Sequence, residues 1–314
     1  MKKFLFCVLV IMSLLGTGCM MSYVKVEESD LKVVSTIFAS YDFSKEIAGE
    51  YGEVTMLLKP GAESHSYEPT PKDIVAIEEC DVFIYVGGEN DAWVDSILES
   101  VDTSDMVIIK MLDLVEKYEE EHENCVEDDC EEHDHEDHSE WDEHVWTSPK
   151  NAVIICEAIT EAFCQVNPVR EKDYNDNLIS YTEKLNALDE EFKDAVENGN
   201  RNTLIFGDRF PLRYFIEEYN LQYYAAFSGC STDTEASPST IAFLIDKVKE
   251  EKIPVILKIE LSSDNIARTI AEDSGAKVLT FNTCHNVTAK DFEEGATYLS
   301  LMEQNLEVLK EALK

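Results

Sequence analysis

The histidines of this chain fall into two groups. Five of the seven lie in residues 116–151, inside the densest run of acidic residues, and the other two, His65 and His285, follow apolar runs typical of strands. Imidazole together with carboxylate is the ligand set that Zn²⁺ and related divalent cations prefer in proteins. These residue types therefore favour a site for a divalent metal ion.

Five polar residues occupy equivalent places close to predicted strands or helix starts: His65, His144, Asp208, Glu260 and His285. Each has a plainer interpretation. A lone histidine in a loop is more often a surface or capping residue, Asp208 has the neighbouring Arg209 as an ion-pair partner, and Glu260 could simply cap or line a cleft. Because histidine is otherwise absent outside the acidic run, the metal-site hypothesis is the stronger one.

Strand-like and helix-like segments alternate along the chain, which predicts an α/β fold with parallel sheets. Strands are predicted at 31–37, 54–58, 82–86, 106–110, 203–206, 221–227, 255–259 and 277–281. Helices are predicted near 40–49, 71–79, 91–99, 149–165, 210–219, 238–251 and 264–274, and over 289–313.

One further helix, within 167–199, is predicted to be long. Its apolar residues recur at spacings of three and four, no Gly or Pro occurs between Val169 and Asn198, and about 30 helical residues extend roughly 45 Å. It should act as a rigid link between an N-terminal lobe at 31–165 and a C-terminal lobe at 201–314. The carboxyl ends of parallel strands then face a cleft between the lobes, where the metal site is expected.

The charge and the motifs of the chain argue against proteins that bind nucleic acids or nucleotides. With 26 Lys and Arg against 65 Asp and Glu, the formal charge is −39, which repels nucleic-acid phosphates and attracts cations. The GxGxxG and P-loop motifs are absent, which argues against nucleotide chemistry. Nucleic acid is therefore excluded as a partner.

Much of the negative charge lies in residues 116–143, with sixteen Asp or Glu, one Lys and four His. This stretch has no apolar period and is predicted to be a disordered or mobile loop of the first lobe. His133, His135 and His138 are candidate weak accessory metal ligands that would collect cations. The alternative is a solvated spacer.

The first 19 residues are predicted to be a targeting signal. Lys2 and Lys3 precede an apolar run at 4–15 that is too short to span a bilayer, and Cys19 follows Gly18. The end resembles a bacterial lipobox, although Gly16 stands where Leu is usual, so Cys19 is the expected lipidation site. The mature chain would be anchored to the outer face of the cell membrane, or periplasmic or secreted if it is not lipidated.

Seven cysteines remain after the signal region, and in an oxidising compartment some should pair. Cys230 and Cys284, in two small polar loops, are the favoured disulfide. Small buried thiols are the alternative for Cys80, Cys156 and Cys164. The pairing of these three and of the loop residues Cys125 and Cys130 stays open.

Several segments together carry a family resemblance: PGAESHSYEPTPKDI, DEHVWTSPKNA, FGDRFPLRYF, TEASPSTI and CHNV. They resemble the zinc/manganese substrate-binding proteins of bacterial ABC importers, in the zinc-type subgroup with a His-rich loop. The resemblance covers essentially the whole mature chain. It implies two lobes bridged by a long helix, a metal ion between them, a monomer, and delivery of the ion to a permease driven by an ATPase.

By motif position, the resemblance makes His65 and His144 the first two ligands. The third position departs from the family, because Gly207 stands where His or Glu is usual, and Gly207→His is expected to be accepted with little harm. His285 lies in the loop that carries the family's last ligand and is expected to supply the third imidazole. Asp208, Glu260 or water would complete a tetrahedron. The resemblance also supports the Cys230–Cys284 bridge.

Three imidazoles favour Zn²⁺, with Mn²⁺ as the alternative ion, since manganese prefers more oxygen ligands. Affinity for the ion should fall as the pH drops through the histidine range near ~6.5. Two other classes of protein remain as alternatives. A zinc hydrolase is disfavoured because no HExxH motif is present, and a metal-binding surface adhesin of the same fold is the other alternative.

Overall fold

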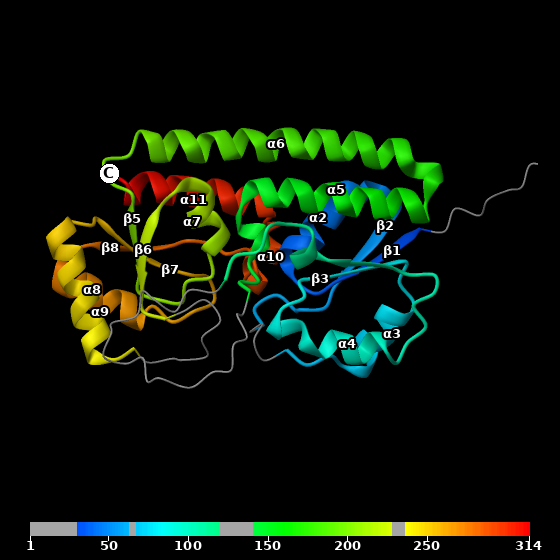
Figure 1. Ribbon diagram of the computed structural model, residues 1–314, viewed down its shortest axis with the longest axis horizontal. Helices are drawn as coiled ribbons and strands as arrows, with labels where there is room; N and C mark the ends of the chain where they lie inside the picture. The colour runs from blue at the N-terminus through cyan, green and yellow to red at the C-terminus, as the bar shows by residue number, and fades with distance from the viewer. Residues whose placement is uncertain (1–29, 63–66, 120–140, 228–235) are drawn as a thin grey trace, which may run out of the picture. The chain divides into compact units, whose positions relative to one another are not determined.

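The computed structural model describes residues 30–62, 67–119, 141–227 and 236–314. Residues Leu31–Lys314 form one unit by their internal contacts. This unit contains two four-stranded parallel sheets, so the predicted α/β class with two lobes and a long linking helix is confirmed (Figure 1).

The N-terminal sheet contains β1 (Leu31–Ser35), β2 (Gly52–Met56), β3 (Val82–Tyr85) and β4 (Val107–Lys110) in the order β2-β1-β3-β4. Its helices are α2 (Phe38–Ala48), α3 (Pro71–Glu78) and α4 (Ala92–Leu98). All four residues of β3 are buried, as expected for an apolar strand covered on both faces of a parallel sheet.

The C-terminal sheet repeats this topology. It contains β5 (Thr203–Phe206), β6 (Gln222–Ala225), β7 (Val255–Lys258) and β8 (Lys277–Thr280) in the order β6-β5-β7-β8. Its helices are α7 (Arg213–Tyr219), α8 (Pro238–Glu251) and α9 (Asn265–Ser274). In each sheet the second strand along the chain lies on one side of the first strand, and the third strand lies on the other side. Ligands of open parallel sheets bind where the order changes direction in this way, beyond the carboxyl ends of the strands.

Helix α6 (Glu171–Glu197) links the two lobes, and α5 (Pro149–Val166) and α11 (Tyr298–Ala312) pack against it. Helix α6 has 27 residues, roughly 40 Å, and extends past both sheets in Figure 1. Its predicted apolar stripe is buried at Tyr174, Tyr181, Leu185, Leu188 and Phe192. The long helix is therefore held by packing against α2, α5 and α11.

The predicted terminal helix at 289–313 is wrong as a single element. The chain forms α10 (Ala289–Glu293), turns, and begins α11 at Tyr298. Gly295 takes the left-handed φ of +81°, and Thr297 starts α11 with a capping box to Ser300. A left-handed glycine followed by a capping threonine ends one helix and starts another.

Short 3-10 turns complete the described elements: η1 (Gly49–Tyr51), η2 (Glu89–Asp91), η3 (Met111–Asp113), η4 (Val145–Thr147) and η5 (Pro168–Arg170). One cluster of buried apolar side chains runs through both sheets and through α2, α5, α6 and α11. Within the described residues no single helix is long and apolar enough to cross a membrane. By length and composition only one pair of helices would do so together, α5 and the helical stretch Pro168–Glu197, and the two are bent by 119° relative to each other.

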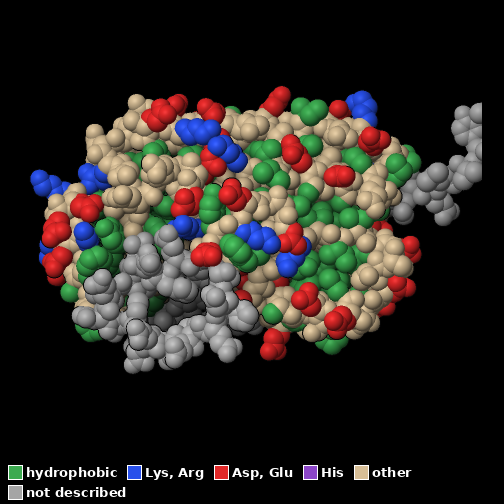
Figure 2. Space-filling view, in the orientation of Figure 1, with side chains coloured by type: hydrophobic (Ala, Val, Ile, Leu, Met, Phe, Trp, Pro, Cys, Tyr) green, Lys and Arg blue, Asp and Glu red, His purple; other side chains and the backbone are tan. Residues whose placement is uncertain are grey.

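Charged side chains are dispersed over the face shown in Figure 2, where Asp and Glu lie among Lys and Arg on both lobes. Some opposite charges four residues apart are paired, such as Lys117 with Asp113 and, within α7, Arg213 with Glu217, each at 2.7 Å. Exposed pairs of this kind add little stability.

Candidate metal site

His144 and His285 come together although they lie in different lobes. His144 immediately precedes η4, and His285 follows β8. Their ring centroids are 5.8 Å apart with the planes at 73°. Since Zn–N bonds are about 2.0–2.1 Å long, two imidazoles at this separation suit a shared metal ion.

Trp146 packs against both imidazoles. Its ring centroid lies 5.4 Å from that of His144 and 5.1 Å from that of His285. The indole N–H donates to the Thr283 carbonyl at 2.8 Å, and the Tyr298 hydroxyl donates to the Trp146 carbonyl at 2.8 Å. The buried indole therefore fixes the apolar wall of the site.

Asp142 orients His144, and the sequence reasoning missed it as a functional residue. Its Oδ1 accepts the backbone N–H of His144 at 2.8 Å and lies 3.2 Å from Nδ1 of the same ring, with both side chains buried. A carboxylate at Nδ1 favours the tautomer that presents Nε2 to a metal and makes the imidazole a stronger ligand. The signal was the D-x-H spacing in DEHVW, hidden among many other acids.

Glu260 supports the loop that carries His285. Its Oε2 accepts the Thr283 N–H at 2.7 Å, and its Oε1 accepts the Thr283 hydroxyl at 2.5 Å. The Thr283 hydroxyl in turn accepts the His285 N–H at 3.2 Å. Burial raises the pKa of the Glu260 carboxyl, and the bonds from Thr283 oppose this shift. A ligand role for Glu260 stays a prediction.

Asp208 is buried just after β5 and holds a turn of its own lobe. Its carboxylate accepts the N–H of Arg209 at 2.8 Å and of Ile259 at 3.0 Å, and it also accepts the Ser262 hydroxyl. These bonds attach the end of β5 to the turn between β7 and α9. Its ligand role likewise stays a prediction.

The expectation that Gly207→His would be accepted is wrong. A Cβ at Gly207 would lie 2.4 Å from Cα of Ala267 and 2.8 Å from its Cβ and N. The end of β5 thus packs directly on the backbone of α9. Any side chain at this position would require α9 to move, so residue 207 offers no room for a third ligand.

Several predicted residues lie outside the described part of the chain: His65, the accessory ligands His133, His135 and His138, the lipidation site Cys19, and Cys125, Cys130 and Cys230. Cys80, Cys156 and Cys284 are buried thiols, and Cys164 is partly exposed. The Cys230–Cys284 disulfide stays a prediction. Within the described residues, no group of three or more His, Cys, Asp or Glu side chains could hold a metal ion.

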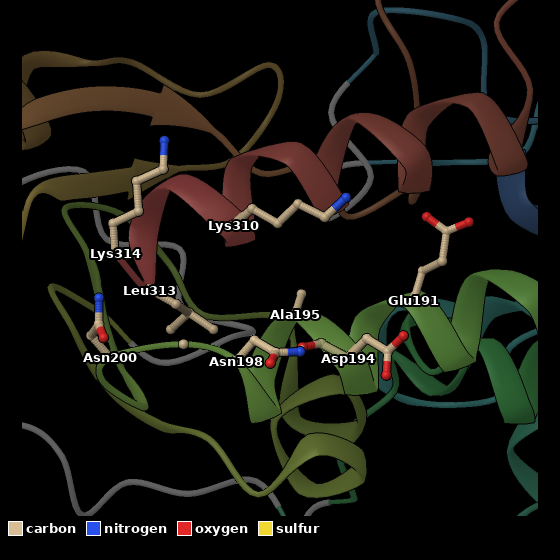
Figure 3. Close-up of a pocket in the computed structure, with 9 residues that line it drawn as sticks. Glu191, Asp194, Ala195, Asn198, Asn200, Lys310, Leu313 and Lys314 are labelled. Carbon is tan, nitrogen blue, oxygen red and sulfur yellow. The ribbon is translucent and has the colours of Figure 1, made fainter.

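A cavity of about 490 Å³ lies elsewhere, between the carboxyl ends of α6 and α11. Glu191 and Asp194 of α6 flank it with Lys310 of α11 and the following Lys314 (Figure 3). None of the candidate ligands lines this cavity, so it is separate from the imidazole pair.

Comparison with known proteins gives a consistent answer. Residues 33–312 match the family model described as zinc-uptake complex component A, periplasmic. The high-affinity zinc uptake system protein ZnuA of Bacillus subtilis is 33% identical over 286 residues, which cover 90% of this chain and 88% of that protein. The zinc-binding lipoprotein AdcA of Streptococcus pneumoniae serotype 4 is 31% identical over 291 residues, 91% of this chain but 56% of AdcA. The chain thus spans about half the length of AdcA.

Solved structures agree on the fold. The Zn(II)-bound ZnuA-like domain of S. pneumoniae AdcA superposes with a TM-score of 0.75 at 28% identity, covering 91% of this chain and 99% of that domain. The metal-dependent lipoprotein YcdH of B. subtilis gives 0.74 at 29% identity, covering 90% and 100%. With the family model matched over nearly all of Leu31–Lys314, the chain belongs to the family of periplasmic zinc-uptake complex component A.

Proposed function

We propose that this protein binds Zn²⁺ outside the cytoplasm and delivers it to an ABC-type membrane permease with its ATPase. The observation that carries the proposal is the pair of imidazoles from separate lobes, His144 and His285, with ring centroids 5.8 Å apart. The zinc-binding relatives support Zn²⁺ as the transported ion. Membership of a family of uptake components favours a binding protein over a hydrolase.

We infer that His65, His144 and His285 supply three imidazoles to the ion. Support for His65 comes from its loop, because the Lys59 and Ala62 carbonyls both accept hydrogen bonds from Asn286, the residue after His285. His65 is three positions after Ala62 in the sequence, and three residues of extended chain span at most about 10 Å, so we infer that His65 can reach the imidazole pair from this anchor.

We infer further that water takes the fourth position. The Asp208 and Glu260 carboxylates are already bonded to backbone N–H groups and hydroxyls, and a metal bond would have to replace those bonds. Water needs no such rearrangement, and three protein ligands plus water is a stable arrangement for Zn²⁺. Three nitrogen ligands make Mn²⁺ the less favoured ion.

The test is isothermal titration with Zn²⁺ on the wild type, the three single His→Ala variants and the His65→Ala/His144→Ala double variant. Each single variant should bind at least about tenfold more weakly, and the double variant should lose high-affinity binding. Asp208→Asn and Glu260→Gln test the fourth position and should retain tight binding. Wild-type affinity in the double variant would overturn the ligand assignment.

We also propose that Cys19 is lipidated and anchors the protein to the outer face of the membrane. The predicted signal segment supports this, and two relatives carry the word lipoprotein in their names. Cys19→Ser should release the protein from the membrane fraction into the soluble fraction. Unchanged membrane retention of this variant would exclude the lipid anchor.

A further inference from the structure

The loop that carries His285 follows the last strand of the C-terminal lobe, yet the N-terminal lobe holds much of it. The His285 carbonyl accepts the N–H of Phe38, the first residue of α2, at 3.0 Å. The Val287 carbonyl accepts the N–H of Gly61 at 2.7 Å. Because the first N–H groups of a helix lack intrahelical partners, the His285 carbonyl satisfies one of them for α2.

Asn286 makes the central contact between this loop and the N-terminal lobe. Its side chain is buried, and Nδ2 donates to the carbonyls of Lys59 and Ala62, each at 2.9 Å. Its Oδ1 accepts the N–H of Val287 at 2.8 Å. Both amide hydrogens and the amide oxygen are thus used, which is what a buried carboxamide requires to be stable.

The ties of the same loop to its own lobe lie on the other side of His285. Asn305 of α11 exchanges hydrogen bonds with the backbone of Asn282, each at 2.7 Å, and Glu260 holds Thr283. Between the two sets of bonds stands Cys284, a non-glycine residue with a left-handed φ of +58°. Thr283 is bonded to both lobes, since its carbonyl also accepts the Trp146 indole N–H. The loop therefore crosses between the lobes at Thr283 and Cys284, and His285 begins the part that the N-terminal lobe holds.

We propose that Asn286 is a positioning residue that fixes the His285 loop to the N-terminal lobe, so that His285 stays beside His144 whether or not metal is bound. The effect on zinc rests on the proposed function, whereas the attachment of the loop does not. A pair held in place before binding loses little conformational freedom when the ion arrives. Zinc affinity should then depend on Asn286, although Asn286 is not a ligand.

The experiment uses the full chain with Asn286→Ala, Asn286→Asp and the matched control Asn305→Ala. Asn286→Asp keeps the size and the oxygen that Val287 uses but replaces the donors to the two carbonyls. Asn305→Ala removes a buried amide of α11 that bonds to the same loop at Asn282, without touching the bonds between lobes. Hydrogen exchange at Gly61 is measured without metal, relative to the slowest amides of β5, and zinc affinity is measured by chelator competition.

Both Asn286 variants should exchange Gly61 at least about tenfold faster than the wild type and bind zinc at least about tenfold more weakly. Asn305→Ala should leave both values within about threefold. Unchanged exchange at Gly61 would overturn the attachment, and faster exchange with unchanged zinc affinity would overturn the positioning role. If the wild type failed to bind zinc, the proposed function would fall, while the exchange data would still decide the attachment.

Discussion

At the scale of single residues, the site depends on side chains that do not bind the metal themselves. Asp142 contacts the Nδ1 side of His144, Trp146 packs on both imidazoles, and Glu260 holds Thr283 beside His285. Such supporting groups set the orientation and basicity of the ligands. The two histidines and the two carboxylates could be selected from the sequence because each follows a predicted strand or precedes a predicted helix. Asp142 was missed, because its D-x-H spacing to His144 is hidden among the many other acids of 116–143.

Asp142→Asn tests this orientation at His144. Asparagine keeps an oxygen for the His144 N–H but removes the negative charge beside Nδ1. Zinc affinity at pH 7 should fall about tenfold, with little change in the free energy of unfolding of the metal-free protein. The control is Asp113→Asn, an exposed aspartate paired with Lys117, which should bind zinc as the wild type does. Equal affinities for the two variants would exclude a role for Asp142.

At the scale of secondary structure, the sequence predicts where most strands and helices lie but does not predict how closely they pack. The apolar runs located all eight strands of the described part of the chain, because buried parallel strands need continuous apolar sequence. The break between α10 and α11 was missed because Gly295 lies in a polar stretch that leaves the apolar spacing of the flanking helices intact. The contact of Gly207 with α9 was also missed, since it joins residues 60 positions apart.

Gly207→Ala should lower the free energy of unfolding by about 1–3 kcal/mol, because a methyl group there must push α9 away from β5. Urea denaturation measures the change. Adding Ala267→Gly should not restore stability, since the nearest atom to the new methyl is the backbone Cα of residue 267. Full rescue by this second substitution would show that the contact involves only side chains.

The ends of the acidic loop offer a second test at this scale. Glu119 and Trp141 form an antiparallel bridge, and the Asp142 N–H donates to the Tyr118 carbonyl at 2.9 Å, so the chain enters and leaves the loop at neighbouring points. Residues 120–140 can therefore be replaced by an Asn-Gly turn. Tight zinc binding should stay within about threefold of the wild type, while weak additional zinc equivalents are lost from the titration. Unchanged total stoichiometry would instead make the loop a spacer.

At the scale of the whole molecule, the two lobes share one apolar core and are also joined by polar contacts. Asp42 of α2 accepts the N–H of Tyr298, the first residue of α11, at 2.8 Å. Burial raises the pKa of the Asp42 carboxyl to about 7, with the Tyr298 bond opposing and Glu46 adding to the shift. Such long-range contacts arise from folding, and the sequence alone did not reveal them.

The raised pKa of Asp42 predicts how stability depends on pH. The native state holds this proton between about pH 4 and pH 7 while the unfolded chain does not, so the contribution of Asp42 to stability is lost as the pH rises through this window. Asp42→Asn keeps an acceptor for Tyr298 and cannot ionise. Its advantage over the wild type in urea denaturation should grow from pH 5 to pH 8, to at most about 4 kcal/mol. A constant difference across this range would mean that Asp42 titrates normally.

The central claim is that one Zn²⁺ ion is bound by imidazoles from both lobes. A crystal structure of the zinc-loaded protein, with anomalous diffraction recorded on both sides of the zinc absorption edge, tests it most directly. We expect one strong peak about 2.0–2.1 Å from a ring nitrogen of His65, of His144 and of His285, with water in the fourth position. A fully occupied zinc peak bonded to neither His144 nor His285 would contradict the claim.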